Sequence, residues 1–432
     1  MREEGKHRGA NDHWRRIFAP EKIFSVSAVA AISPYLLWAL GAKPPVVQRM
    51  NLTYVPALIW GCGLLSFVAG ARLAHRFGRP QGAFRLSQRN VPVTFLLYLG
   101  IAAVFVQVYF AAVDVYGTVP LVDYLSGDGG IDVGAANDQQ QYSGFGQLGL
   151  LTASLYAINP LLLLSVIQWA TWRRGARILI GFALLLVSFA HLLNAKRQGL
   201  YSALFYLLVG LSVYFGNPIQ AFSTLLPWRR SPVLTRLCLA TSFAVLLLAF
   251  GYIASIRTQG RVAASTGEVI TYLQYPLVNF EAQCAAAGVG PGEFKLLGPL
   301  RNLVPYKYGE VTESFAVTVP RVISSSPSGM YEYIQWCWGI TGIVLYSFLL
   351  GLVARWLFDR AVASLACLLS YCYLAVALAM AHSNNQALIL SYGPIPLLFV
   401  SLFSLLILTE RLSPSAGCFQ VPQTRRIAVP VR

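Results

Sequence analysis

The stretch Trp338–Phe358 reads WGITGIVLYSFLLGLVARWLF and contains one charged side chain, Arg355. An α-helix needs about 20 predominantly apolar residues to cross the hydrocarbon core of a bilayer, which is about 30 Å thick. Most of the chain is built from similar blocks. Of its 432 residues, 56% are hydrophobic and only 12% are charged, whereas a soluble domain carries about 25% charged residues. The sequence therefore predicts an integral membrane protein.

Working outward from this block, we find ten apolar blocks. The predicted fold class is an all-α polytopic integral membrane protein of about ten transmembrane helices. The predicted helices are Ile23–Leu40, Tyr54–Leu73, Val91–Val113, Leu148–Trp169, Ile178–Leu193, Leu200–Phe215, Val233–Ser255, Trp338–Phe358, Ala361–Ala381 and Ile389–Leu408. The fifth and sixth are short and are separated only by Asn194–Gly199. They are either two spans joined by a tight turn or a hairpin that does not cross fully.

The distribution of Lys and Arg predicts the orientation. With residues 1–22 inside, the inner segments hold 23 of these residues and the outer segments 10, six of which lie in one long loop. Positive charge in short loops marks the cytoplasmic side. We therefore expect both termini, including the tail 409–432, in the cytoplasm. The outer face then has a polar loop, Asp114–Gln147, and a long extracytoplasmic loop, 256–337, between the seventh and eighth helices.

Composition and spacing exclude several classes of function. The net charge of +16 lies in short segments between apolar blocks, so we expect no nucleic-acid partner. No CxxC or HExxH spacing occurs, and the aspartates of 114–147 lack a calcium-loop pattern, so we expect no metal and no cofactor. Cys284 and Cys337 lie in the predicted outer loop, where a disulfide bond is chemically permitted; the spacing leaves that bond open.

Two adjacent cations, Lys196 and Arg197, lie in the short turn predicted on the outer face, against the positive-inside rule. Charge close to the hydrocarbon is costly and usually faces a cavity or a partner. One interpretation is that both side chains reach outward to lipid phosphates. The other is that they recognise a phosphate-bearing, lipid-linked substrate, with Arg197 as a bidentate donor.

A second group of cations follows the seventh helix. Arg257 and Arg261 are four residues apart, which places them on one helical face if the helix continues, although Gly260 weakens that continuation. Each alone is typical of an interface anchor. Arg321, further along the outer loop, is a weaker member of the group.

His382 opens the last outer loop, where an imidazole could act as a general base. A histidine at a helix end is also often a simple polar terminus. Outer carboxylates are alternative bases, and the sequence does not rank them. They are Glu310, Glu313 and Glu332.

The order of these features resembles the oligosaccharide repeat-unit polymerases, the Wzy-type O-antigen polymerases of bacteria. A polar outer loop precedes the fourth helix, a Lys-Arg-Gln-Gly turn separates two short helices, and an arginine pair opens the long loop. The end of that loop and the next helix match the C-terminal part of the family: Ser328-Gly-Met-Tyr331-Glu-Tyr333, Trp338-Gly-Ile-Thr-Gly342 and Leu350-Gly351.

The resemblance implies a metal-independent glycosyltransferase in the bacterial inner (plasma) membrane. Such enzymes transfer a growing glycan from a polyprenyl pyrophosphate to another lipid-linked repeat unit. The implied partners are the polyprenyl-pyrophosphate-linked oligosaccharide, membrane lipids, a chain-length regulator and a flippase. The roles carried over are pyrophosphate stabilisation for Arg197, Arg257 and Arg261, the base for His382, and substrate binding for Lys196, Arg321, Tyr331 and Glu332.

Two alternatives stay open at this point. An O-antigen ligase-like enzyme, which moves a finished glycan to another acceptor, shares the many-helix layout and an arginine-bearing outer loop. A polysaccharide or lipid transporter is the alternative from another class. A transporter is expected to place polar groups near the bilayer midplane, and few ionisable residues lie inside the predicted spans.

Overall fold

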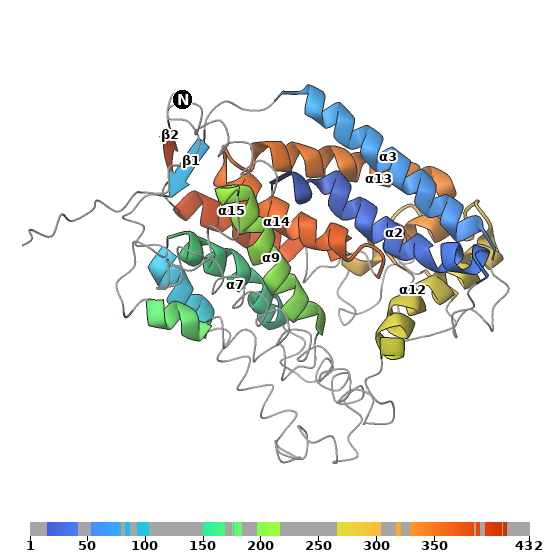
Figure 1. Cartoon of the computed structure of the whole chain (residues 1–432), viewed down its shortest axis with the longest axis horizontal. Coiled ribbons are helices and arrows are strands. Elements are labelled where there is room, and N and C mark those ends of the chain that lie inside the picture. Colours follow the sequence, from blue (N-terminus) through green and yellow to red (C-terminus); the bar gives the residue numbers. More distant parts are fainter. Residues whose placement is uncertain are drawn as a thin grey trace, which may run out of the picture.

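The computed structural model describes part of the chain, and all structural statements below concern that part. The described residues are 15–41, 53–78, 83–86, 93–102, 150–168, 175, 177–183, 197–216, 266–303, 317–320, 329–383, 386–388, 394–407 and 409–412. The longer elements are helices (Figure 1). They are α2 (Pro20–Ala39), α3 (Val55–Arg76), α7 (Leu150–Ile167), α9 (Arg197–Phe215), α12 (Thr266–Ala287), α13 (Glu332–Arg360), α14 (Leu365–Ala379) and α15 (Pro394–Leu406).

Three of these helices, α2, α3 and α13, are long and apolar enough to cross a membrane. Shorter apolar helices accompany them: Val93–Ala102, Ile158–Ile167, Tyr201–Phe215, Leu365–Ala379 and Pro396–Leu406. Many large apolar side chains of these helices are exposed, such as Leu65 at 73% and Leu405 at 84%, and apolar surface of this extent is the surface that a membrane helix presents to lipid. The fold is that of a multi-pass membrane protein.

The most extensive helix contact joins α3 to α13, which run side by side along the molecule (Figure 1). Glycines allow the two backbones to touch: a Cβ added at Gly70 would overlap the carbonyl oxygen of Phe348, and one at Gly351 would overlap that of Phe67. Small residues have this role in membrane helix pairs, where packing rather than water exclusion drives association.

α13 extends further upstream than predicted. The sequence predicted a start at Trp338, whereas the helix begins at Glu332 and crosses a kink at Gly339, where φ is 61° and ψ is −156°. A Cβ at Gly339 would lie 2.9 Å from the carbonyl oxygen of Val289. The segment after α12 therefore packs directly on the kink, and the Ile340 N–H donates to Val289 at 3.0 Å.

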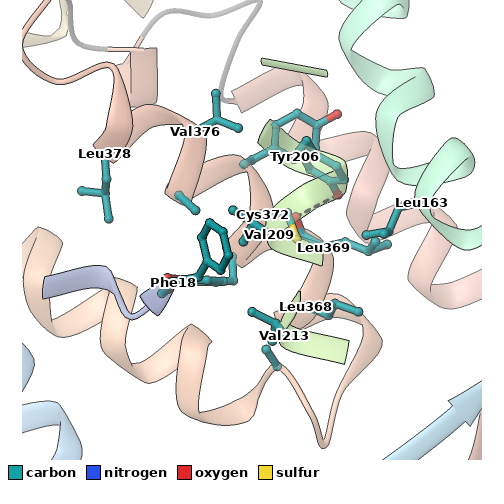
Figure 2. Packing of buried hydrophobic residues seen from close by; sticks show 14 of the residues in the cluster. Phe18, Leu163, Tyr206, Val209, Val213, Leu368, Leu369, Cys372, Val376 and Leu378 are labelled. Atoms are coloured by element: carbon teal, nitrogen blue, oxygen red, sulfur yellow. Dashed lines mark hydrogen bonds between the residues drawn. The ribbon is translucent and has the colours of Figure 1, made fainter. Parts of the chain in front are cut away.

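A second packing layer consists of α14 with α9, α7 and α15. Figure 2 shows apolar side chains of α14, including Leu369 and Cys372, meeting Val209 and Val213 of α9. The Tyr206 hydroxyl donates to the carbonyl of Leu369 at 3.1 Å. This polar group is buried, and the bond satisfies it within the bundle.

One end of the bundle carries a two-stranded antiparallel ribbon, which the all-α prediction lacked. β1 (Ala83–Leu86) pairs with β2 (Thr409–Leu412), and Phe84 contacts Tyr214 near the end of α9 with ring centroids 5.6 Å apart. The chain therefore returns to the same end after α3 and after α15.

Seven of the ten predicted helices match described helices over most of their lengths. The third and fifth are described over 93–102 and 177–183, and the seventh, Val233–Ser255, lies outside the described residues. α12 was not among the predicted helices, because it lies within the segment 256–337 that was predicted as an outer loop. The helix contains Pro276.

Candidate functional site

A hollow lies between α2, α3 and α12, in the half of the bundle away from the ribbon. The hollow is partly open to the outside, and its cavity volume of about 10 Å³ is room for about one water molecule. Apolar side chains make most of its wall, and His382 is its only ionisable lining residue within the described part of the chain. The lining residues are Ala30, Ala31, Pro34, Trp60, Pro276, Leu277, Phe280 and His382.

His382 lies in the turn after α14, against the middle of α2. The Ser27 hydroxyl is 3.3 Å from Nδ1 of the ring and accepts the backbone N–H of His382 at 2.9 Å. Ser27 is 12 residues before the end of α2, which corresponds to about 18 Å of helix. The imidazole is therefore recessed within the bundle and does not lie at its rim.

Burial sets the protonation state of His382. Desolvation lowers the pKa of the ring below its usual 6.5, and a hydrogen bond to the backbone of Ala379 opposes this shift only in part. Because the charged form is the one that burial disfavours, the imidazole is neutral at neutral pH. A neutral imidazole is the form that accepts a proton.

Tyr331 packs against Trp60, one of the residues that line the hollow. Its side chain is fully buried, its ring packs on Trp60 with centroids 4.7 Å apart, and its hydroxyl bonds with Ser347 at 2.7 Å. The ring thus has no exposed atom with which to contact a substrate. Tyr331 therefore holds the Trp60 ring in place, and its predicted role in substrate binding stays a prediction.

Glu332 is likewise buried, with 4% of its surface exposed. Its backbone carbonyl accepts a hydrogen bond from Gln283 of α12 at 2.6 Å, and the same Gln283 amide contacts Gln335 at 2.5 Å. These bonds join α12 to the first turn of α13. The roles predicted for Glu332, in substrate binding or as an alternative base, stay predictions.

The sequence analysis missed Glu281, a buried carboxylate of α12 that is 2% exposed. One oxygen accepts the Tyr35 hydroxyl at 2.5 Å, and the other accepts both the N–H and the hydroxyl of Thr53 at 2.6 Å. Charge-assisted bonds of this length are strong. They tie α12 to α2 and to Thr53, two residues before α3. No local signal distinguishes Glu281 in the sequence, since its partners are more than 200 residues away.

We predict that Glu281→Ala destabilises the protein by about 2–3 kcal/mol. The substitution leaves the buried donors of Tyr35 and Thr53 without an acceptor, and hydrogen bonds to charged groups contribute about 1.5–3 kcal/mol each. Thermal unfolding of the detergent-purified protein measures the effect. Glu293→Ala is the matched control, because Glu293 follows α12 and is only half-buried. Equal melting temperatures for the two variants would contradict the prediction.

The predicted cations are described only in part. Arg197 is the first residue of α9, so the predicted turn Asn194–Gly199 ends in helix; nothing is described of the Arg197 side chain. α9 reaches the ribbon at Tyr214 and is 19 residues long. Arg197 therefore begins the helix about 27 Å from the end that meets the ribbon. The other predicted cations and carboxylates lie outside the described residues: Lys196, Arg257, Arg261, Arg321, Glu310 and Glu313.

The two outer cysteines are not joined. Cys284 and Cys337 are both buried free thiols, so the disulfide bond that the sequence left open is absent. The described residues also contain no group of three or more His, Cys, Asp or Glu side chains arranged to hold a metal.

An ionic cluster, which the sequence analysis also did not predict, joins three helices near the start of α2. Arg355 of α13 donates to Asp359 at 2.9 Å and to Glu21 of α2 at 3.0 Å, and its guanidinium lies 3.1 Å from Nδ1 of His75 at the end of α3. Asp359 is almost fully buried, with 2% of its side chain exposed. This cluster is far from the hollow along α2 and holds the helix ends together.

Comparisons of the chain with protein-family models, curated proteins and solved structures find no match.

Proposed function

We propose that the chain is a glycan polymerase that extends O-antigen or exopolysaccharide chains with repeat units linked to polyprenyl pyrophosphate. The observation that carries this proposal is the recessed hollow with a neutral imidazole beside an indole ring. A neutral His382 can accept the proton of an acceptor hydroxyl as a general base, and Trp60 adds an aromatic wall. The reaction would take place on the extracytoplasmic face of a bacterial plasma membrane.

The sugar donor leaves a pyrophosphate, whose developing charge needs cations. The described lining of the hollow contains no Lys or Arg. In the proposal, pyrophosphate is therefore bound by Arg197, with which α9 begins, together with the predicted cations Arg257, Arg261 and Lys196. The acceptor end of the reaction carries no charge, and in the proposal its hydroxyl meets the imidazole of His382. The two sites must adjoin, because the acceptor oxygen bonds to the same anomeric carbon that the pyrophosphate oxygen leaves.

The experiment is deletion of the gene followed by electrophoresis of the surface polysaccharide. We expect long chains to disappear and single-unit glycans to remain. Wild type should restore the ladder, whereas His382→Ala and Arg197→Ala should not, although both insert in the membrane at normal levels. Arg360→Ala is the control, because Arg360 stacks on Trp356 in the last turn of α13, away from the hollow.

Three outcomes would contradict the polymerase. Unchanged chain length in the deletion strain would rule it out. Full-length glycan that accumulates on the lipid carrier would identify a ligase. Repeat units trapped on the cytoplasmic side would identify a transporter.

A further inference from the structure

The segment 289–297, which joins α12 to the short 3₁₀ helix Gly298–Leu303, exposes apolar side chains. Phe294 is 72% exposed and Leu296 68%, and Val289 and Leu297 are also exposed large hydrophobic residues. The sequence predicted this segment as part of an outer loop. Exposed apolar side chains gathered in one place indicate an interaction surface. We call 289–297 the apolar segment.

Backbone hydrogen bonds fix the apolar segment on the first turns of α13. The Trp336 carbonyl accepts the backbone N–H of Gly292 at 2.9 Å and that of Glu293 at 3.1 Å. The Val289 carbonyl accepts the N–H of Ile340 at 3.0 Å. A Cβ at Gly292 would overlap the Trp336 ring, so the segment lies directly on the indole. Its position along α13 is therefore between Trp336 and Ile340.

α13 indicates where the bilayer begins and ends. After Ile340 the helix exposes large apolar side chains at helical spacing, which form a lipid-facing stripe: Val344, Leu345, Leu349, Val353 and Trp356. The Trp356 ring stacks with the guanidinium of Arg360, 20 residues after Ile340. That interval is about 30 Å of helix, which matches the thickness of a hydrocarbon core.

Tryptophans are enriched at both membrane–water boundaries. Trp356 lies at one end of this interval on α13, and Trp336 and Trp338 lie at the other. The apolar segment is bonded to the second end. It therefore lies at the bilayer boundary at which α13 begins, next to the lipid-facing stripe.

Two observations restrict the apolar segment to the headgroup region. Its backbone is not helical, and such backbone is not exposed to hydrocarbon, because its polar groups would lack partners. It also contains Glu293 and Lys295, and charge in the hydrocarbon is costly. Apolar side chains at the interface reach about 5–10 Å into the boundary between headgroups and acyl chains.

We propose that the apolar segment is an interfacial membrane anchor, in which Phe294 and Leu296 insert among the lipid headgroups at the end of the bilayer where α13 begins. The anchor ties the end of α12 to the membrane surface. The occupant of this surface is lipid, because the segment continues the lipid-facing stripe of α13 at the depth of the headgroups. This inference does not rest on the proposed polymerase.

The test measures the depth of residue 294 in the bilayer. Phe294→Cys carries a nitroxide label, and the full chain is reconstituted in vesicles of phosphatidylethanolamine and phosphatidylglycerol. Collisions with oxygen, which concentrates in lipid, are compared with collisions with a water-soluble nickel complex. Wild type taken through the same labelling supplies the signal of the native thiols, which is subtracted. Lipids labelled at known positions calibrate the depth.

Leu349→Cys is the matched control, because Leu349 is 50% exposed on the lipid-facing stripe of α13. We expect the label at 294 to lie below the lipid phosphates, but less deep than the label at 349. Its ratio of oxygen to nickel collisions should exceed that of a free nitroxide in buffer. Leu296→Cys should report a similar depth and provides a second variant if Phe294→Cys does not fold.

Two results would overturn the anchor. Free access of the nickel complex to residues 294 and 296 would place the segment in water. Low access of both reagents would show that protein, either a second copy of the chain or another partner, covers it. Loss of polymer on deletion of the gene tests the polymerase alone, so either proposal can fail while the other stands.

Discussion

Gly70→Leu is expected to prevent α3 from pairing with α13, so that the protein no longer purifies as a single folded species. At Gly70 the backbone of α3 lies directly against that of α13, and any Cβ would overlap the Phe348 carbonyl. A clash with a backbone atom cannot be relieved by a change of rotamer, as a clash with a side chain can. The cost should therefore exceed the about 1–3 kcal/mol that is usual for overpacking.

Gly61→Leu is the control for this prediction. Gly61 is on the same helix, and a Cβ there meets nothing within 4 Å, so the larger residue should be tolerated on this face. Size-exclusion profiles and melting temperatures in detergent compare the two variants. Gly351→Leu should reproduce the loss from the other side of the contact. A well-folded Gly70→Leu protein would show that α3 and α13 do not approach as closely as described.

Arg355→Leu is expected to destabilise the protein by about 3–5 kcal/mol. Removing one partner of a buried ion pair leaves an uncompensated charge, and this cost is larger than the net value of the pair. Arg355 compensates two carboxylates at once, Glu21 and the buried Asp359. It also stacks on Phe358, with its guanidinium carbon 5.3 Å from the ring centroid, so packing is lost as well.

The control for Arg355 is Arg360→Leu in the next turn of α13, where the guanidinium stacks on Trp356 at 4.5 Å and no described carboxylate bonds to it. Thermal unfolding should show a large decrease for Arg355→Leu and a small one for Arg360→Leu. Adding Asp359→Leu to Arg355→Leu should recover part of the loss, because it removes the stranded charge. Equal effects of the two arginine variants would show that the cluster contributes little.

The apolar blocks predicted the long helices well because the membrane acts on each block locally. α2 and α3 begin and end within three residues of their predicted bounds. The error at α13 has a physical origin: Gly339 was taken as part of the helix start, whereas its positive φ makes it a kink. α12 was missed because Gln, Asn, Glu and Pro interrupt its apolar pattern. Of these residues, Glu281 and Gln283 bond to other helices.

The candidate site could be predicted only in part. His382 was identified as a polar residue at a helix end, and the structure places it in the hollow. Ser27 and Glu281 could not be found in this way, because a serine within a helix and a glutamate in a loop are common. Tyr331 was taken for a substrate contact because tyrosines often line glycan sites. Its partner Ser347 satisfies the hydroxyl inside the core.

The sequence by itself determined that this is a membrane protein and where most of its long helices lie. A bilayer requires each spanning segment to be long, apolar and hydrogen-bonded within itself, and those properties are local. Only the tertiary structure decided which residues meet: Ser27 with His382, 355 positions apart, Glu281 with Tyr35, and β1 with β2. Such contacts depend on how helices pack through small residues and buried polar pairs, and that packing is not encoded in any one stretch of the chain.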